Sequence, residues 1–226
     1  MTTPKPVVLC ILDGWGSGES SVANAPHLAQ TPTFDAIIAQ GPQARLITHG
    51  PDVGLPSGQM GNSEVGHTNI GAGRVVAMDL GQIDLAIEDG SFFENAALQD
   101  FIAKLKATGG AAHLMGLVSD GGVHGHITHI LAAVKAVTDA GVPVWLHAIT
   151  DGRDVAPKSA LGYFETLQKA LPEGAEIATV TGRYFAMDRD NRWARVSQAY
   201  SAMINGGGRA AADALAAVAS AYDQSD

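Results

Sequence analysis

The chain has 226 residues, 46% of them hydrophobic, which is enough apolar surface for one large domain or two smaller ones. Its formal net charge of −9 argues against a nucleic-acid-binding surface, and its apolar runs are far shorter than the roughly 20 residues of a membrane span. A lone cysteine, Cys10, excludes an intrachain disulfide and fits a reducing compartment, so we expect a cytoplasmic protein. The apolar neighbours of Cys10 predict a buried thiol that acts as a small hydrophobe.

The first 50 residues contain two predicted strands. Residues 7–12 form a continuous apolar run typical of a central parallel strand, with Asp13 at its carboxyl end, where open α/β sheets place ligand sites. Asp13 followed by glycine is also a common turn pair, so a plain turn is the alternative. After a loop near residues 24–27, Thr31 and Pro32 predict the start of a helix that ends near residue 40. A second strand is expected over residues 44–48.

A glycine-rich stretch, SGQMGNSEVGHTNIGAGR, spans residues 57–74 and has the composition of a ligand site rather than of a core. Ser63 lies where a turn opens into a helix, and free N–H groups and the helix dipole favour negative charge there. The sequence therefore predicts that Ser63 meets a phosphate. The alternative is that Ser63 only caps the helix.

The remainder of the chain alternates helices and strands, which predicts an α/β fold with a parallel sheet. Apolar residues at helical spacing indicate helices over residues 75–88, 96–108, 127–140, 158–170, 193–205 and 209–221. Continuous β-prone runs indicate strands over residues 111–118, 143–149 and 176–180.

Polar and charged side chains follow each of these three strands. Because the carboxyl ends of parallel strands share one edge of a sheet, we expect a cationic rim there, made of His124, Arg153, Asp154, Arg183 and Arg189. Arginine forks bind carboxylate or phosphate bidentately, so this rim predicts a small substrate with more than one anionic group. Surface ion pairs with the neighbouring aspartates are the alternative for each arginine.

Two metal sites are compatible with the sequence. No histidine lies in a nucleophile-elbow motif, so a catalytic Ser63 needs a metal for activation, and Asp13 supplies a hard oxygen ligand that could share it. A metal-dependent hydrolase of the amidohydrolase kind would instead use His124 and His126, with Asp151 or Asp154 as a further ligand. Packing and helix capping are the alternative roles of His126 and His129.

Five motifs together resemble one enzyme family, the cofactor-independent (2,3-bisphosphoglycerate-independent) phosphoglycerate mutases of the alkaline phosphatase superfamily. They are LDGWG at residues 12–16, GNSEVGH at 61–67, SDGGVH at 119–124, DGRD at 151–154, and GRY through DRD at 182–190. The resemblance implies a glycolytic isomerase that interconverts 3- and 2-phosphoglycerate through a phosphoserine intermediate, with two manganese ions (Mn2+). It also implies that Ser63 is the nucleophile, that Asp13 and Ser63 contact one metal, and that the cationic rim binds phosphoglycerate.

The resemblance further implies a division of the chain. Residues 1–77 would be the N-terminal segment of the phosphatase domain, a partial alkaline-phosphatase-like segment, and residues 78–226 part of the phosphotransferase domain. Members of the family are usually monomeric and longer, with the remaining metal ligands in a C-terminal half, so we expect a truncated chain. Such a chain is either active with a second polypeptide that supplies this half, or an inactive remnant that binds small phosphorylated acids.

Overall fold

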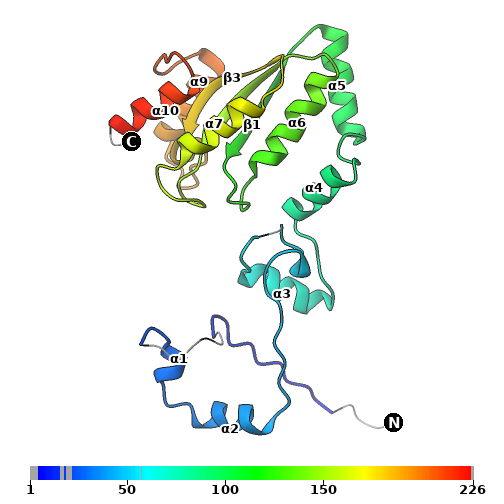
Figure 1. The fold of residues 1–226 in the computed structure, drawn as a ribbon, viewed down its shortest axis with the longest axis vertical. Helices are drawn as coiled ribbons and strands as arrows, with labels where there is room; N and C mark the ends of the chain where they lie inside the picture. The colour runs from blue at the N-terminus through cyan, green and yellow to red at the C-terminus, as the bar shows by residue number, and fades with distance from the viewer. Residues whose placement is uncertain (1–4, 16–17, 19–21, 57, 225–226) are drawn as a thin grey trace.

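The computed structural model describes residues 5–15, 18, 22–56 and 58–224, so Gly16 and Ser57 of the motifs above lie outside the described part. Its main body is a three-stranded parallel sheet in the order β1 (Ala112–Val118), β2 (Val144–Thr150), β3 (Ala175–Gly182). The predicted α/β class and parallel sheet are confirmed, with the strands in chain order (Figure 1).

The helices of this body, apart from the short α8 (Arg183–Ala186), which was not predicted, begin and end close to the predicted residues. They are α4 (Asp79–Glu88), α5 (Ala96–Thr108), α6 (Ile127–Asp139), α7 (Ala160–Ala170), α8, α9 (Trp193–Asn205) and α10 (Ala214–Asp223). Three of them, α4, α7 and α10, start later than predicted. The N–H of Met78 donates to the carbonyl of Gly54, which keeps the chain before α4 out of the helix. The Asp213 carboxylate accepts from the N–H of Ala216 and sets the start of α10.

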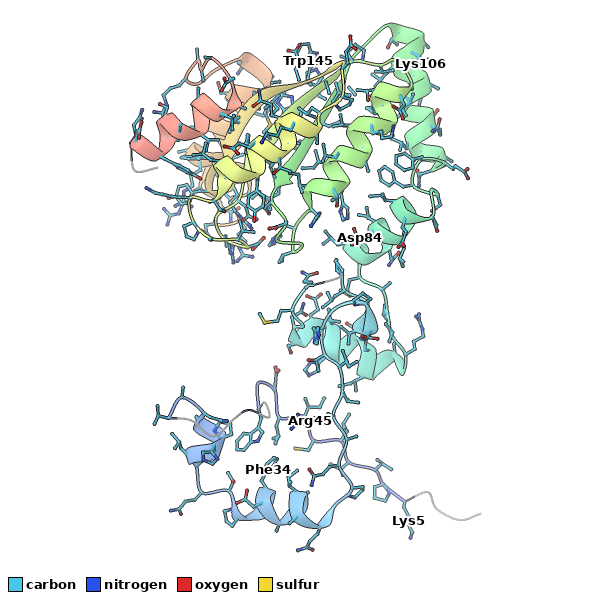
Figure 2. The ribbon with its side chains drawn as sticks, viewed as in Figure 1. Lys5, Phe34, Arg45, Asp84, Lys106 and Trp145 are labelled. Carbon is cyan, nitrogen blue, oxygen red and sulfur yellow. The ribbon has the colours of Figure 1, made fainter. Side chains whose placement is uncertain are left out.

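One face of the sheet is buried under helices. Leu146 and Ala148 of β2 pack with Phe164 and Leu167 of α7, and with Val218 of α10, in an apolar cluster. A second cluster joins the opposite ends of β1 and β2 to α5 and α6. On the other face, Met115 and Trp145 are 66% and 38% exposed, and Figure 2 shows Trp145 at the end of the sheet farthest from the N-terminal segment.

The two strands predicted before residue 50 are wrong. Residues 7–12 and 44–48 have no strand pairing in the structure, and Val7, Val8 and Leu46 are 94%, 87% and 83% exposed. A strand exists only when a neighbouring strand accepts its backbone hydrogen bonds, and β1 to β3 are the strands found among the described residues. Cys10 is likewise exposed rather than buried, because no element covers this run.

The remaining N-terminal elements are short. The predicted helix is present as α2 (Pro32–Gln40), with Thr31 directly before it. The segment expected to be a loop contains α1 (Ala25–Leu28), which the Asn24 side chain caps by accepting from the N–H of His27. Phe34 of α2, labelled in Figure 2, packs on Trp15 with ring centroids 5.2 Å apart.

Between this segment and the sheet lie η1 (Pro51–Val53) and α3 (Ser63–Ala72) (Figure 1). Leu55 and Val65 are buried at 6% and 2% exposure, and Asn69 donates to the carbonyl of Val53 while it accepts from the N–H of Val76. These contacts hold residues 50–78 together as one small packed unit. None of the helices in the described part is both long and apolar enough to cross a membrane.

Candidate active site

Ser63 is the first residue of α3, and its hydroxyl is free of the capping role. Asn62 caps the helix, because its side-chain oxygen accepts from the N–H of Val65 at 3.0 Å. The alternative reading of Ser63 as the cap is therefore wrong. The hydroxyl of Ser63 lies at the helix end where partial positive charge favours an anion.

Asp13 and Ser63, 50 residues apart in the chain, meet in the structure. The Ser63 hydroxyl donates to Asp13 Oδ2 at 3.0 Å, and both residues are exposed. Asp13 lies in a turn closed by the N–H of Trp15 and the carbonyl of Leu12, with Gly14 at φ 73°, so the turn reading of Asp13 is confirmed. The turn presents the carboxylate to α3.

The chemistry of these two side chains fits a divalent cation in part. Carboxylate and hydroxyl oxygens are hard ligands of the kind Mg2+ and Mn2+ prefer, but such ions take about six ligands. Among the described residues no cluster of three or more His, Cys, Asp or Glu side chains is placed to hold a metal. Asp13 and Ser63 therefore fit one side of a coordination sphere.

His67 is a neighbour of Ser63 that the sequence reasoning did not single out. Its Nδ1 lies 2.8 Å from the Ser63 carbonyl oxygen and 3.1 Å from Ser63 Oγ, one helical turn away. A carbonyl oxygen only accepts, so we assign the proton to Nδ1. With Nδ1 protonated, His67 orients the serine and does not take its proton through that atom. The i, i+4 spacing from serine to histidine was the available signal.

At the carboxyl ends of the strands, three of the predicted substrate residues form one cluster, in which the side chains of Asp154 and Arg183 are buried and that of His124 is exposed. Arg183 Nη1 donates to Asp154 Oδ2 at 2.7 Å, and His124 Nδ1 lies 2.7 Å from the same oxygen. His124 follows β1, Asp154 follows β2 and Arg183 begins α8 directly after β3, so the parallel register brings them together. A carboxylate only accepts, so Nδ1 of His124 is the protonated nitrogen and Nε2 faces away from Asp154.

Asp151 is the centre of this cluster, a role that the sequence reasoning missed. Its side chain is 1% exposed and accepts from Arg183 Nη1 at 2.7 Å and from Ser119 Oγ at 2.6 Å. It also accepts the N–H groups of Arg153 and Asp154, at 3.1 and 3.0 Å. An aspartate that opens an Asp-Gly-Arg-Asp loop was the signal, because such side chains bond to backbone N–H groups two and three residues on.

The buried charges shift the pKa values of this cluster. Burial alone would raise the pKa of Asp154 and Asp151, but their hydrogen bonds outweigh it and lower both. For Asp154 the donors are Arg183 and His124, and for Asp151 they are Ser119, two backbone N–H groups and Arg183. Burial would likewise lower the pKa of Arg183, but its two carboxylate partners raise it. Both aspartates are therefore ionised at neutral pH.

Arg153 and Arg189 join Arg183 on the wall of a large cavity. The cavity has a volume of about 1040 Å³ and lies between the ends of β2 and β3 and the helices α9 and α10. The cationic residues of its lining are Arg153, Lys158, Arg183, Arg189, Arg195 and Arg209. The predicted cationic rim is thus divided: His124, Asp154 and Arg183 bond to one another, while the three arginines share the cavity. The ion-pair alternative holds for Arg183, although its pairs are buried rather than on the surface.

The histidines of the alternative hydrolase site have three different partners. His126 caps α6 by accepting the N–H of Thr128, and His129 Nε2 lies 2.6 Å from Asp84 of α4, which Figure 2 labels. His124 contacts Asp154. These contacts agree with the packing and capping roles of His126 and His129 and favour the serine site.

Comparisons with known proteins found a matching family model, similar sequences and a similar solved structure. A family model described as the BPG-independent PGAM N-terminus matches residues 83–226. The chain is 78% identical over 227 residues to a protein of Ruegeria sp. (strain TM1040), and 74% identical over 226 residues to one of Ruegeria pomeroyi. Both relatives are named 2,3-bisphosphoglycerate-independent phosphoglycerate mutase. A crystal structure of Leishmania mexicana phosphoglycerate mutase at low cobalt concentration is also similar, with a TM-score of 0.71 and 34% identity.

The alignments cover this chain far more fully than they cover its relatives. Each Ruegeria alignment spans 100% of this chain and 45% of the relative, and the Leishmania alignment spans 88% of this chain and 38% of that one. The chain therefore spans about half the length of the curated relatives it matches.

Proposed function

The chain belongs to the BPG-independent phosphoglycerate mutase family, and on that premise we propose that it carries the nucleophile and the substrate cluster for interconversion of 3- and 2-phosphoglycerate. The observation that carries this proposal is Ser63, whose hydroxyl is freed by the Asn62 cap and held on Asp13 at the N-terminus of α3. The metal-dependent hydrolase is not proposed, because His124 and His126 have separate partners.

A division of the chain into a nucleophile part, residues 1–77, and a substrate part, residues 78–226, belongs to the same proposal. In its support, Ser63 and Asp13 lie in the segment that precedes α4, and this segment lies outside the body formed by the sheet and its helices (Figure 1). His124, Asp154 and Arg183 all follow strands of the sheet.

In the first half of the reaction, Ser63 Oγ attacks the phosphorus of phosphoglycerate in line. The Oγ–P bond forms as the bond from phosphorus to the substrate oxygen breaks. The hydroxyl proton leaves toward Asp13 Oδ2, and the released glycerate oxygen takes up a proton from water. The free N–H groups at the start of α3 and the arginines of the cavity stabilise the charge on the phosphoryl oxygens.

A divalent cation bound by Asp13 and Ser63 would lower the pKa of the serine hydroxyl and stabilise charge on the phosphoryl group. We propose manganese for this ion, as the family resemblance implies.

In the second half, the substrate cluster holds glycerate while it turns. The ionised Asp154 accepts a hydrogen bond and then a proton from the incoming hydroxyl, and Nε2 of His124 is free to contact the same substrate. The oxygen of that hydroxyl forms a bond to phosphorus as the Ser63 Oγ–P bond breaks. Asp13 returns its proton to Oγ, which restores the serine, and Asp154 releases its proton to water. Arg183 holds Asp154 in place throughout.

Substitution of the nucleophile tests the proposal directly. The Ser63→Ala chain is expected to form no phosphoenzyme, whereas the unmodified chain, mixed with manganese and a separately expressed C-terminal half of a relative, incorporates labelled phosphate at residue 63. Mass spectrometry of the peptide that contains α3 measures this. Ser91→Ala, at an exposed serine outside the site, is the control and should label normally. Turnover by Ser63→Ala at the unmodified rate would refute the assignment.

The chain by itself has a simpler proposed activity, the binding of small phosphorylated acids. The cationic cavity and the buried Arg183 support it, because both are complete within the described residues. Titration calorimetry with 3-phosphoglycerate is expected to show binding that Arg189→Ala weakens. Binding without turnover, in the presence and absence of the C-terminal half, would make this chain a binding remnant.

A further inference from the structure

Gln59 joins the segment that carries Ser63 to the loop that carries His124. Its side-chain Nε2 donates to the carbonyl oxygen of Gly122, 63 residues further along the chain. A carbonyl oxygen only accepts, which identifies the amide nitrogen as the atom that faces it. We infer that Gln59 is a positioning residue for phosphoryl transfer, a tether that keeps Ser63 next to the substrate cluster. This inference rests on the function proposed above.

On the serine side, Gln59 is fixed to the same packed unit as Ser63. The backbone of Gln59 accepts from the N–H of Gly50 at 3.0 Å and donates to the carbonyl of Pro56 at 3.2 Å. Two residues on, Gly61 passes so close to Thr48 that an added Cβ would lie 1.7 Å from the Thr48 carbonyl oxygen. Because the backbone is held on both sides of Gln59, a displacement of this side chain moves the start of α3 with it.

On the other side, Gly122 belongs to a loop that is rigidly joined to the cluster. The loop begins at Ser119, which is fully buried and donates to Asp151, and it closes where the N–H of Ile127 donates to the Ser119 carbonyl at 2.8 Å. Gly121 packs so tightly that an added Cβ would lie 2.9 Å from Cβ of Asp154. The Gly122 carbonyl therefore keeps a fixed place relative to Asp154.

The Gln59 bond thus couples two units that each hold half of the chemistry. Phosphoryl transfer loses rate steeply when reacting groups are misplaced by about 1 Å, so the spacing of the two units matters for turnover. It matters little for substrate affinity, because the arginines that bind the anion all lie on the side of Gly122. Loss of the tether should lower kcat and leave the Kd for phosphoglycerate unchanged.

The distance between the two units can be measured on the 226-residue chain without any activity. Spin labels go on Thr68→Cys of α3 and Lys169→Cys of α7, both exposed, in a Cys10→Ser background. Gln59→Met keeps the volume and removes the donor, while Gln59→Glu sets a carboxylate against the carbonyl. Both should reduce the population at the native distance, Gln59→Met by about two- to tenfold, the change expected for one lost hydrogen bond.

Gln99→Met is the matched control. Gln99 is an exposed glutamine of α5 whose Nε2, like that of Gln59, donates to a backbone carbonyl, here that of Phe93 at 2.6 Å, but this bond is local. It should leave the distance distribution as in the parent chain. Unchanged distributions in both Gln59 variants would overturn the inference, whether or not the chain proves to be a mutase.

The second measurement uses the mixture with the C-terminal half. There, Gln59→Met should lower kcat while calorimetry gives an unchanged Kd for 3-phosphoglycerate. Equal loss of binding and turnover would assign Gln59 to substrate contact and contradict the positioning role. If the unmodified mixture has no activity, the proposed function fails and the distance measurement still decides whether the tether exists.

Discussion

At the scale of single residues, Asp151 organises the substrate cluster. A carboxylate that is 1% exposed costs free energy to bury, and that cost is met by bonds from Arg183, Ser119 and two backbone N–H groups. The same bonds orient the loop that carries Arg153 and Asp154. Asp151 therefore acts on the substrate residues rather than on the substrate.

Asp151→Asn should lower the free energy of unfolding by roughly 1–3 kcal/mol, because it weakens a buried charge-assisted bond and turns one acceptor into a donor that faces other donors. Urea denaturation at neutral pH measures this. The control is Asp139→Asn, which breaks an exposed pair with Lys135 on one helix and should cost less than about 0.5 kcal/mol. Equal effects of the two substitutions would contradict the role of Asp151.

At the scale of elements, α3 presents the nucleophile because its cap is the residue before it. Asn62 satisfies the N–H of Val65, so the hydroxyl of Ser63 remains available to Asp13. Val65 is the one buried residue of this helix, so packing contributes little to its stability. The helix therefore depends on its cap more than a helix of the core does.

Asn62→Ala should destabilise α3 by about 1 kcal/mol and speed amide hydrogen exchange along the helix. Asn95→Ala is the matched control, since Asn95 caps α5 through the N–H groups of Ala97 and Leu98. That variant should affect α5 and leave exchange in α3 unchanged. Exchange in α3 that stays constant on loss of Asn62 would show that tertiary contacts hold the helix.

At the scale of the whole molecule, a chain of polar contacts crosses the sheet on the face opposite α7. His147 of β2 lies 3.0 Å from His113 of β1 and 2.9 Å from Thr179 of β3. Burial, and secondly the charge of His113, lower the pKa of His147. The folded protein therefore binds a proton at this residue less readily than the unfolded chain, in which the pKa is near 6.5.

The contribution of His147 to stability should be complete above about pH 6.5 and lost as the pH falls from there through its lowered folded pKa. Urea unfolding at a series of pH values from about 7.5 to 5 should therefore show a smaller loss of stability for His147→Gln than for the parent chain. His49→Gln, at an exposed histidine, should lose stability as the parent does. Parallel curves for the parent chain and His147→Gln would refute this assignment.

The sequence by itself determined the elements whose signals are local. The helical spacing of apolar residues and the residues that flank each helix predicted α5 (96–108) and α9 (193–205) to the residue. The continuous β-prone runs predicted the parallel sheet. His124, Asp154 and Arg183 lie in the segments that follow the three strands, and this was enough to predict that they share one edge, because the carboxyl ends of parallel strands lie at the same edge of a sheet. The motifs likewise indicated the family that the comparisons show.

Only the tertiary structure decided the features that depend on distant partners. Whether residues 7–12 form a strand depends on a neighbour to pair with, so an apolar run alone predicted it wrongly. The contacts of Ser63 with Asp13, of Gln59 with Gly122 and of Asp151 with Arg183 each join segments 30 or more residues apart. Local sequence fixes the side chains that can make such bonds, but the packing of whole elements determines which of them come within reach.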